Sequence, residues 1–106
     1  MEALAFSLKT ANGEERVIEF PLHPETGDAA AVGDMLEALL ETLSEYVTGE
    51  TPVSNGDVVQ ALAMVTSIRL GMLPVPMKAA RALFDDLLEQ AAEAEQRWHP
   101  GAGGRA

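Results

Sequence analysis

Residues 58–73, VVQALAMVTSIRLGML, form an almost wholly apolar run, and no other feature constrains the fold of this chain as strongly. Arg69 is the only charged residue in it. The run is too short to span a bilayer, and Gln60 and Arg69 interrupt it. Ser54 and Asp57 stand three residues apart before it, as in a helix capping box. We therefore expect a helix over residues 55–70 that apolar surfaces cover nearly all round.

The charge of the chain limits its partners. Its 106 residues, enough for one domain, include 17 acidic and 7 basic side chains, which give a net charge of −10. Such a charge repels phosphate backbones and anionic lipids, so we expect neither nucleic acid nor a membrane as partner. A basic polypeptide is the partner that the charge favours, and the apolar run adds a hydrophobic polypeptide as a further possibility.

Cysteine is absent, which excludes a disulfide framework, a thiol nucleophile and a thiolate metal site. The first four residues lack the basic start and apolar core of a signal peptide. We therefore expect a cytoplasmic protein. The many alanines, and more arginine than lysine, are typical of a GC-rich bacterial genome.

Two segments near the N-terminus alternate apolar and polar residues, as half-buried strands do. Their apolar positions are Leu4, Phe6 and Leu8 in the first segment and Ile18, Phe20 and Leu22 in the second. Asn12-Gly13 between them is a strong hairpin signal. A two-residue turn would place Glu19 among the apolar side chains, opposite Phe6. We therefore expect a longer or bulged turn with Gly13 at positive φ and with Phe6 opposite Phe20 and Leu8 opposite Ile18.

Two further helices flank the apolar run. Asp28 is a suitable N-cap for a helix over residues 29–48, whose apolar positions follow helical spacing. Pro76 suits the first turn of a third helix over residues 76–98. The sequence thus predicts an α+β fold in which an N-terminal β-hairpin is followed by three α-helices. Residues 1–98 would form a single domain, and residues 99–106 a disordered tail.

The third helix carries a heptad seam, with apolar residues at alternating intervals of three and four. Its members are Met77, Ala80, Phe84, Leu87, Ala91, Ala94 and Trp98. One interpretation is a seam between two subunits, with Trp98 as an anchor, because aromatic residues are enriched at interfaces. The other is an ordinary amphipathic helix packed inside one subunit. The need to cover the apolar run favours the first.

Arg69 allows three interpretations. It could neutralise the C-terminal end of its helix and extend to water. It could form a buried ion pair, with Asp85 or Asp86 as partner. It could also hold an anionic ligand.

The remaining candidates are polar residues without a catalytic pattern. An acidic stripe on the first helix, which has the composition of a solvated face, consists of Asp34, Glu37, Glu41 and Glu45. His23 and His99 each precede a proline, and neither has a metal-ligand neighbour at helical spacing. We find no nucleotide-binding, zinc-binding or serine-nucleophile motif, and we expect no cofactor or metal.

These features favour a non-catalytic, acidic protein-interaction module, adaptor-like or chaperone-like in kind, that forms a homodimer. Closed two-fold dimers are the commonest way to cover an exposed apolar surface. The alternative function is a small-ligand-binding protein or enzyme. It would have a pocket between the hairpin and the helices and would use Arg69, His23 or Tyr46.

Overall fold

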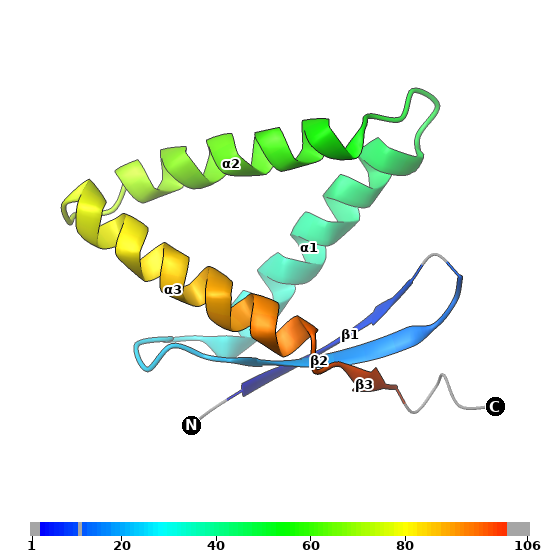
Figure 1. Ribbon diagram of the computed structural model, residues 1–106, viewed down its shortest axis with the longest axis horizontal. Coiled ribbons are helices and arrows are strands. Elements are labelled where there is room, and N and C mark those ends of the chain that lie inside the picture. The colour runs from blue at the N-terminus through cyan, green and yellow to red at the C-terminus, as the bar shows by residue number, and fades with distance from the viewer. Residues whose placement is uncertain (1–2, 11, 102–106) are drawn as a thin grey trace. The chain divides into compact units, whose positions relative to one another are not determined.

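The chain begins with two strands, continues with three helices and ends with a short strand (Figure 1). The computed structural model describes residues 3–10 and 12–101. The elements in chain order are β1 (Ala3–Lys9), β2 (Glu15–Pro21), α1 (Ala29–Thr48), α2 (Asn55–Gly71), α3 (Met77–Glu95) and β3 (His99–Pro100). The expected α+β fold, a hairpin followed by three helices, is confirmed, and the short third strand is an addition to it.

The described chain divides into two compact units. One contains the described parts of Met1–Gly33 and Asp85–Ala106, and the other is Asp34–Phe84. The first holds all three strands and the second holds α2. Both α1 and α3 run from one unit into the other.

The hairpin has the expected turn residue but a different register. Gly13 has a φ of 89°, as expected. The strands pair Phe6 with Ile18 and Leu4 with Phe20. We expected Phe6 opposite Phe20, so the expected pairing was wrong: each β1 residue lies opposite the β2 residue two positions earlier. The turn is centred on Asn12 and not on Gly13, because the Thr10 N–H donates to the Glu14 carbonyl at 2.8 Å and the Gly13 N–H donates to the Thr10 carbonyl at 3.0 Å. The shift is an even number of residues, so the same side chains still share the apolar face.

β3 extends the sheet on the far side of β2, in the order β1-β2-β3 (Figure 1). It pairs antiparallel with β2, with Arg16 opposite Pro100 and Val17 opposite His99. The Gly101 N–H adds a bond to the Glu15 carbonyl at 3.3 Å. His99 and Pro100, which we expected in a disordered tail, are therefore part of the sheet, and residues 102–106 of that tail lie outside the described residues.

Side-chain capping starts the first two helices, as the sequence predicts. The Asp28 carboxylate accepts a hydrogen bond from the Ala31 N–H at 3.0 Å, at the start of α1. At the start of α2 the Ser54 hydroxyl accepts from the Asp57 N–H, and the Asp57 carboxylate accepts from the Ser54 N–H. These bonds satisfy N–H groups that have no partner inside the helix. α3 ends at Glu95, three residues earlier than expected, so Trp98 lies beyond it.

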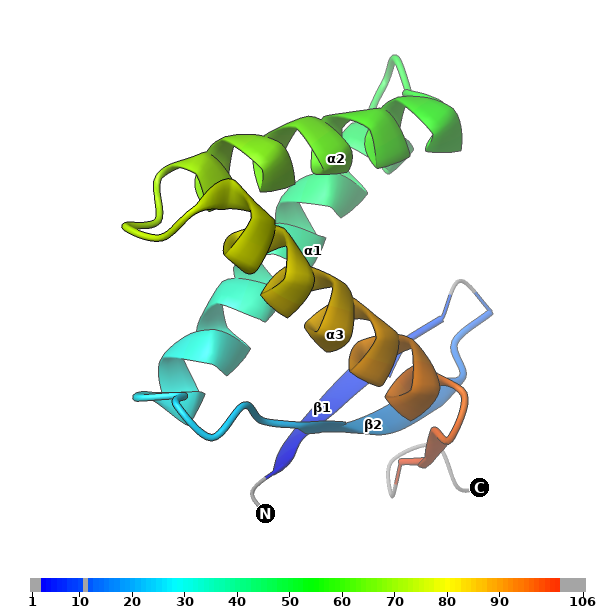
Figure 2. The same cartoon turned by 60° about the vertical axis from the view of Figure 1, so that its left-hand side comes forward.

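Few side chains are fully buried. The buried hydrophobic residues among those described are Ile18, Ala80 and Ala94. Ile18 lies in β2, and Ala94 lies in the last turns of α3, which both views place over the sheet (Figure 2). Gly33, at the start of α1, packs against β1, since a Cβ there would meet the Leu4 side chain at 3.4 Å. The sheet therefore carries the better-packed part of the chain.

Candidate protein-interaction surface

α2 exposes large apolar side chains on opposite sides. Val59 is 65% exposed and Ile68 is 59% exposed. They are nine residues apart, which is about half a turn round an α-helix at 3.6 residues per turn. We call the exposed set the α2 apolar surface, and it comprises Val59, Leu62, Met64, Val65 and Ile68. Gln60 and Ser67, seven residues apart, form a polar strip along one side of that helix, and its other polar residues are Asn55, Asp57, Thr66 and Arg69.

No neighbour in its own unit covers this surface. Among the described residues α2 has no buried residue, and it does not pack along its length against the neighbouring parts of α1 or α3 (Figures 1 and 2). The turn after it, which begins with Met72, adds further exposed apolar side chains. An exposed apolar area of this kind makes α2 a candidate interaction surface.

α2 also differs in charge from the rest of the chain. Its two charged residues, Asp57 and Arg69, cancel, whereas the whole chain has a net charge of −10. The acidic stripe of α1 (Asp34, Glu37, Glu41 and Glu45) is exposed along its length. α2 therefore carries no net charge, whereas α1 carries an exposed acidic stripe.

Arg69 occupies the last turn of α2, where a cation favours the negative end of the helix dipole. Its Nη1 donates to the sulfur of Met72 at 3.0 Å, and its side chain is exposed. This placement fits the first of the three interpretations of Arg69. Its roles in an ion pair or in anion binding stay predictions.

The heptad seam of α3 is unevenly exposed. Ala80 is 1% exposed and Ala94 is 7% exposed, whereas Met77 is 49% exposed. Phe84, Leu87 and Ala91 are half-buried. The two alanines are already covered in a single chain, so α2 offers more free apolar surface than the seam. An intersubunit role for the seam stays a prediction.

Trp98 has a partner within its own chain. The guanidinium carbon of Arg16, on β2, lies 4.3 Å from the centre of the Trp98 ring, within the range of a cation–π interaction. The same guanidinium also lies 3.2 Å from the Glu14 carboxylate. This contact holds the chain after α3 against the sheet, next to the point where β3 pairs with β2.

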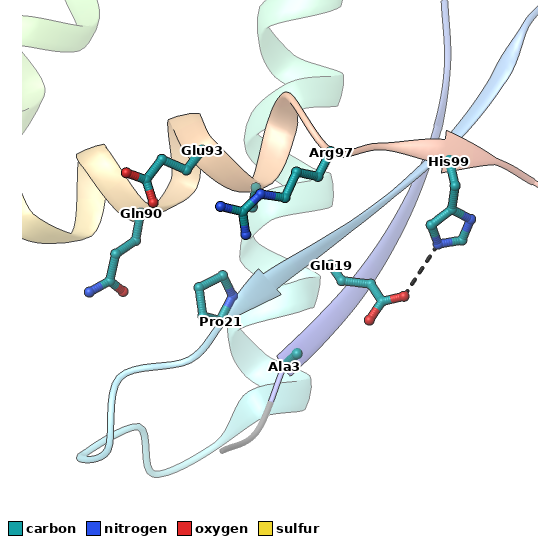
Figure 3. A pocket seen from close by; sticks show the side chains of 8 residues that line it. Ala3, Glu19, Pro21, Gln90, Glu93, Arg97 and His99 are labelled. Atoms are coloured by element: carbon teal, nitrogen blue, oxygen red, sulfur yellow. Dashed lines mark hydrogen bonds and ion pairs between the residues drawn. The ribbon is translucent and has the colours of Figure 1, made fainter.

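A pocket opens between the hairpin and the end of α3 (Figure 3). Its volume is about 390 Å³. The residues that line it are Ala3, Glu19, Pro21, Gln90, Glu93, Ala94, Arg97 and His99. The Nε2 atom of His99 lies 3.3 Å from a Glu19 carboxylate oxygen, which is the dashed contact in Figure 3.

The pocket lies where the alternative function expects one, but its residues are different. Arg69, His23 and Tyr46 do not line it. His23 instead uses its Nδ1 atom to accept a hydrogen bond from the Glu25 N–H at 3.1 Å. Sequence reasoning missed Arg97 and Gln90, because only the return of the chain to β2 brings them into the same pocket as Glu19.

In the part of the chain that the structure describes, no three His, Asp or Glu side chains gather as a metal site would require. None of the helices formed by residues 3–10 and 12–101 has both the length and the apolar character needed to cross a bilayer. Comparison with protein-family models, with curated proteins and with solved structures finds no match for this chain.

Proposed function

We propose that this chain is a non-catalytic, self-associating protein-interaction module in which a second copy covers the α2 apolar surface. One observation supports the proposal above all. α2 exposes large apolar side chains on opposite sides and has no buried residue among those described. Large apolar side chains that stay open to water over a whole helix favour an interaction surface.

The distribution of charge favours a second copy as the occupant. Two chains with a net charge of −10 each repel one another wherever their acidic faces meet. α2 carries one acidic and one basic residue, so this helix can approach its own copy without that repulsion. The same neutrality makes α2 a poor site for a strongly basic partner.

The energy of this contact is moderate. Full burial of a Val, Leu, Ile or Met side chain is worth about 1.5–3 kcal/mol, so completing the burial of a half-exposed one contributes about 1 kcal/mol. The α2 apolar surfaces of two copies together thus contribute about 10 kcal/mol, which association costs of about 4–15 kcal/mol largely offset. A stable dimer therefore needs a further contact between the copies.

The acidic stripe of α1 gives the module a surface for a different partner. Its carboxylates are exposed, and a basic polypeptide is the class of partner that they attract. In this proposal α2 holds two copies together and α1 presents the acidic face. A hydrophobic polypeptide would compete with the second copy for α2.

The oligomeric state tests the proposal. Static light scattering of the purified chain at micromolar concentration should report twice the chain mass of 11.3 kDa. A hydrophobic dye should bind weakly, because the α2 apolar surface is covered in the dimer. A folded monomer that remains monomeric at a hundredfold higher concentration would refute the proposal.

The pocket in Figure 3 favours a second candidate function, the binding of a small ligand. A volume of about 390 Å³ is within the range of ligand sites, and Arg97, Gln90 and His99 offer polar groups at its wall. Native mass spectrometry of the protein purified from its host should then show a retained small molecule. Replacing Arg97 with alanine should remove that molecule, and its absence from the unmodified protein would contradict this candidate.

A further inference from the structure

The outer edge of β1 carries backbone groups that no strand pairs with. The Thr10 N–H donates to the Glu14 carbonyl, and these two residues continue the register in which Phe6 lies opposite Ile18. Hydrogen-bonded pairs alternate along an antiparallel ladder, so Leu4, Phe6 and Leu8 direct their N–H and C=O groups toward β2. The residues between them direct their N–H and C=O groups away from β2, to the outer edge of the sheet. These residues are Ala3, Ala5, Ser7 and Lys9.

A bond on the other side of the hairpin supports this assignment. By the same alternation the Glu15 carbonyl must point away from β1. It does, because it accepts the Gly101 N–H at 3.3 Å beside β3. In the sheet order β1-β2-β3, no described residue pairs with the outer edge of β1.

The two edges of the sheet are protected to different degrees. β3 covers part of the β2 edge, and Pro21, which has no N–H, ends β2. Such features discourage a further strand from pairing there. β1 has seven residues, contains no proline, and has a single charged residue, Lys9, at its end. β1 is therefore the edge that is open to another strand.

The sequence of β1, ALAFSLK, is nearly self-complementary about Phe6. A two-fold axis at Phe6 would place Leu4 of one copy opposite Leu8 of the other, and Ala5 opposite Ser7. The apolar side chains of Leu4, Phe6 and Leu8, which are half-buried, then lie on one face of a joined sheet. The small exposed side chains of Ala5 and Ser7 lie on the other.

This axis also uses every outward group of β1. The residues with outward groups pair as Ala5 with Ser7 and as Ala3 with Lys9, so that the four outward N–H groups of each copy meet outward carbonyls of the other. If the two-fold axis moved by one residue along the strand, some of these outward N–H and C=O groups would have no partner in the other β1 strand. β1 carries no acidic residue, so two negatively charged chains can meet at this edge.

We propose that β1 of one copy pairs antiparallel with β1 of a second copy, with Phe6 opposite Phe6 on a two-fold axis. The two sheets become one continuous sheet. The identity of the partner rests on the self-association proposed above, and the geometry rests on the sheet edge.

Amide hydrogen exchange of the unmodified protein tests the pairing without any substitution. The amides of Phe6 and Leu8 point to β2 and are protected in any case. The amides of Ala5 and Ser7 point outward, so pairing should slow their exchange by more than about 100-fold relative to an unstructured peptide. Fast exchange at Ala5 and Ser7 beside slow exchange at Phe6 would overturn the proposal.

Single cysteines test the register, because the chain contains no cysteine of its own. Directly opposed residues at a non-hydrogen-bonded position have Cα atoms about 4.5 Å apart, which a disulfide can bridge. Phe6→Cys should therefore form a disulfide-linked dimer under mild oxidation. Leu8→Cys is the matched control, since its copies would lie about 14 Å apart along the strands.

Neither Leu4→Cys nor Leu8→Cys alone should crosslink the two copies. A chain that carries both substitutions should crosslink, because residue 4 of one copy lies opposite residue 8 of the other. Equal crosslinking of the Phe6 and Leu8 variants would overturn the two-fold axis at Phe6. If the cysteine variants fail to fold by circular dichroism, hydrogen exchange on the unmodified chain still decides.

The outcomes separate this proposal from that for α2. If the protein is a dimer but the Ala5 and Ser7 amides exchange fast, the copies meet without β1 pairing, and only the present proposal fails. If β1 is protected and Phe6→Cys crosslinks while charged substitutions on α2 leave the dimer unchanged, β1 pairing stands and the role of α2 fails.

Discussion

Replacing Ile68 with glutamate should weaken association of the two copies. Ile68 is 59% exposed on α2 in a single chain, so the substitution removes little packing that the chain itself provides. In the dimer it removes about 1–2 kcal/mol of apolar burial from each copy, or about 2–4 kcal/mol in all. Enclosing two unpaired carboxylates adds to this loss. The dissociation constant should therefore rise at least about 30-fold, since every 1.4 kcal/mol is a factor of ten.

Ser67→Glu is the matched control for that substitution. Ser67 is the preceding residue, lies about 100° round the helix on the polar strip, and is also exposed. It receives the same charge but should leave the dissociation constant within a few-fold of the unmodified value. Molar mass by light scattering across a range of concentrations gives both constants. Equal behaviour of Ile68→Glu and Ser67→Glu would refute the assignment of α2 as the covered surface.

Two further predictions concern the turn and the acidic stripe. Gly13→Ala should lower the free energy of unfolding by about 1 kcal/mol, because Gly13 has a φ of 89° that alanine adopts poorly. Urea melts at fixed protein concentration measure this change. An unchanged or higher free energy of unfolding would contradict strain at the turn. Replacing Glu37, Glu41 and Glu45 together with lysine should leave the helical circular dichroism signal intact, because all three side chains are exposed. The triple substitution should abolish binding of polylysine. Retained binding would show that another surface attracts basic chains.

The hairpin shows what alternation can and cannot predict. The apolar positions of β1 and β2 predict which side chains share a face, and that face is correct. The register depends on the turn, where the Thr10 hydroxyl and the Asn12 side-chain oxygen both accept from the Glu14 N–H at 3.2 Å. These local bonds centre the turn on Asn12, one residue before Gly13, and this shifts the strand pairing by two residues. A shift by an even number leaves the apolar pattern unchanged, so the pattern alone could not exclude it.

β3 could not be predicted from local sequence. Proline and glycine at residues 100 and 101 are typical of loops, not strands. The strand forms because the Gly101 N–H meets the Glu15 carbonyl and Trp98 stacks against Arg16. Each contact joins residues more than 80 positions apart, and neither has a periodic signal in the sequence. The pocket residues Arg97 and Gln90 were missed for the same reason.

Unlike β3, the exposed apolar surface of α2 could be predicted from the sequence. Its apolar character on nearly every side is visible in the sequence, and the described structure leaves that surface without a neighbour along its length. Periodicity predicts that a surface needs cover, but it does not identify what covers it. Charge distribution and the self-complementary edge of β1 supply the argument for a second copy, and both depend on placing residues in the fold.

The small buried core predicts that folding and association are coupled. The buried hydrophobic residues among those described, Ile18, Ala80 and Ala94, include two alanines, which bury little apolar area. If a second copy covers α2 as proposed, we expect much of the stability to come from contacts between copies, as in obligate dimers. Each tenfold rise in protein concentration should stabilise the folded dimer by about 0.7 kcal/mol per chain, half of 1.4 kcal/mol.

For a chain of this size that gain raises the melting temperature by about 3–6 °C. Thermal unfolding followed by circular dichroism over a hundredfold concentration range measures it, and the helical signal on dilution should fall together with the molar mass. Ile68→Glu should melt at a lower temperature than Ser67→Glu at every concentration, and the gap should narrow as concentration rises enough to restore the dimer. A melting temperature that does not change with concentration would show that a single chain is sufficient for its own stability, and would remove the energetic argument for a second copy on α2.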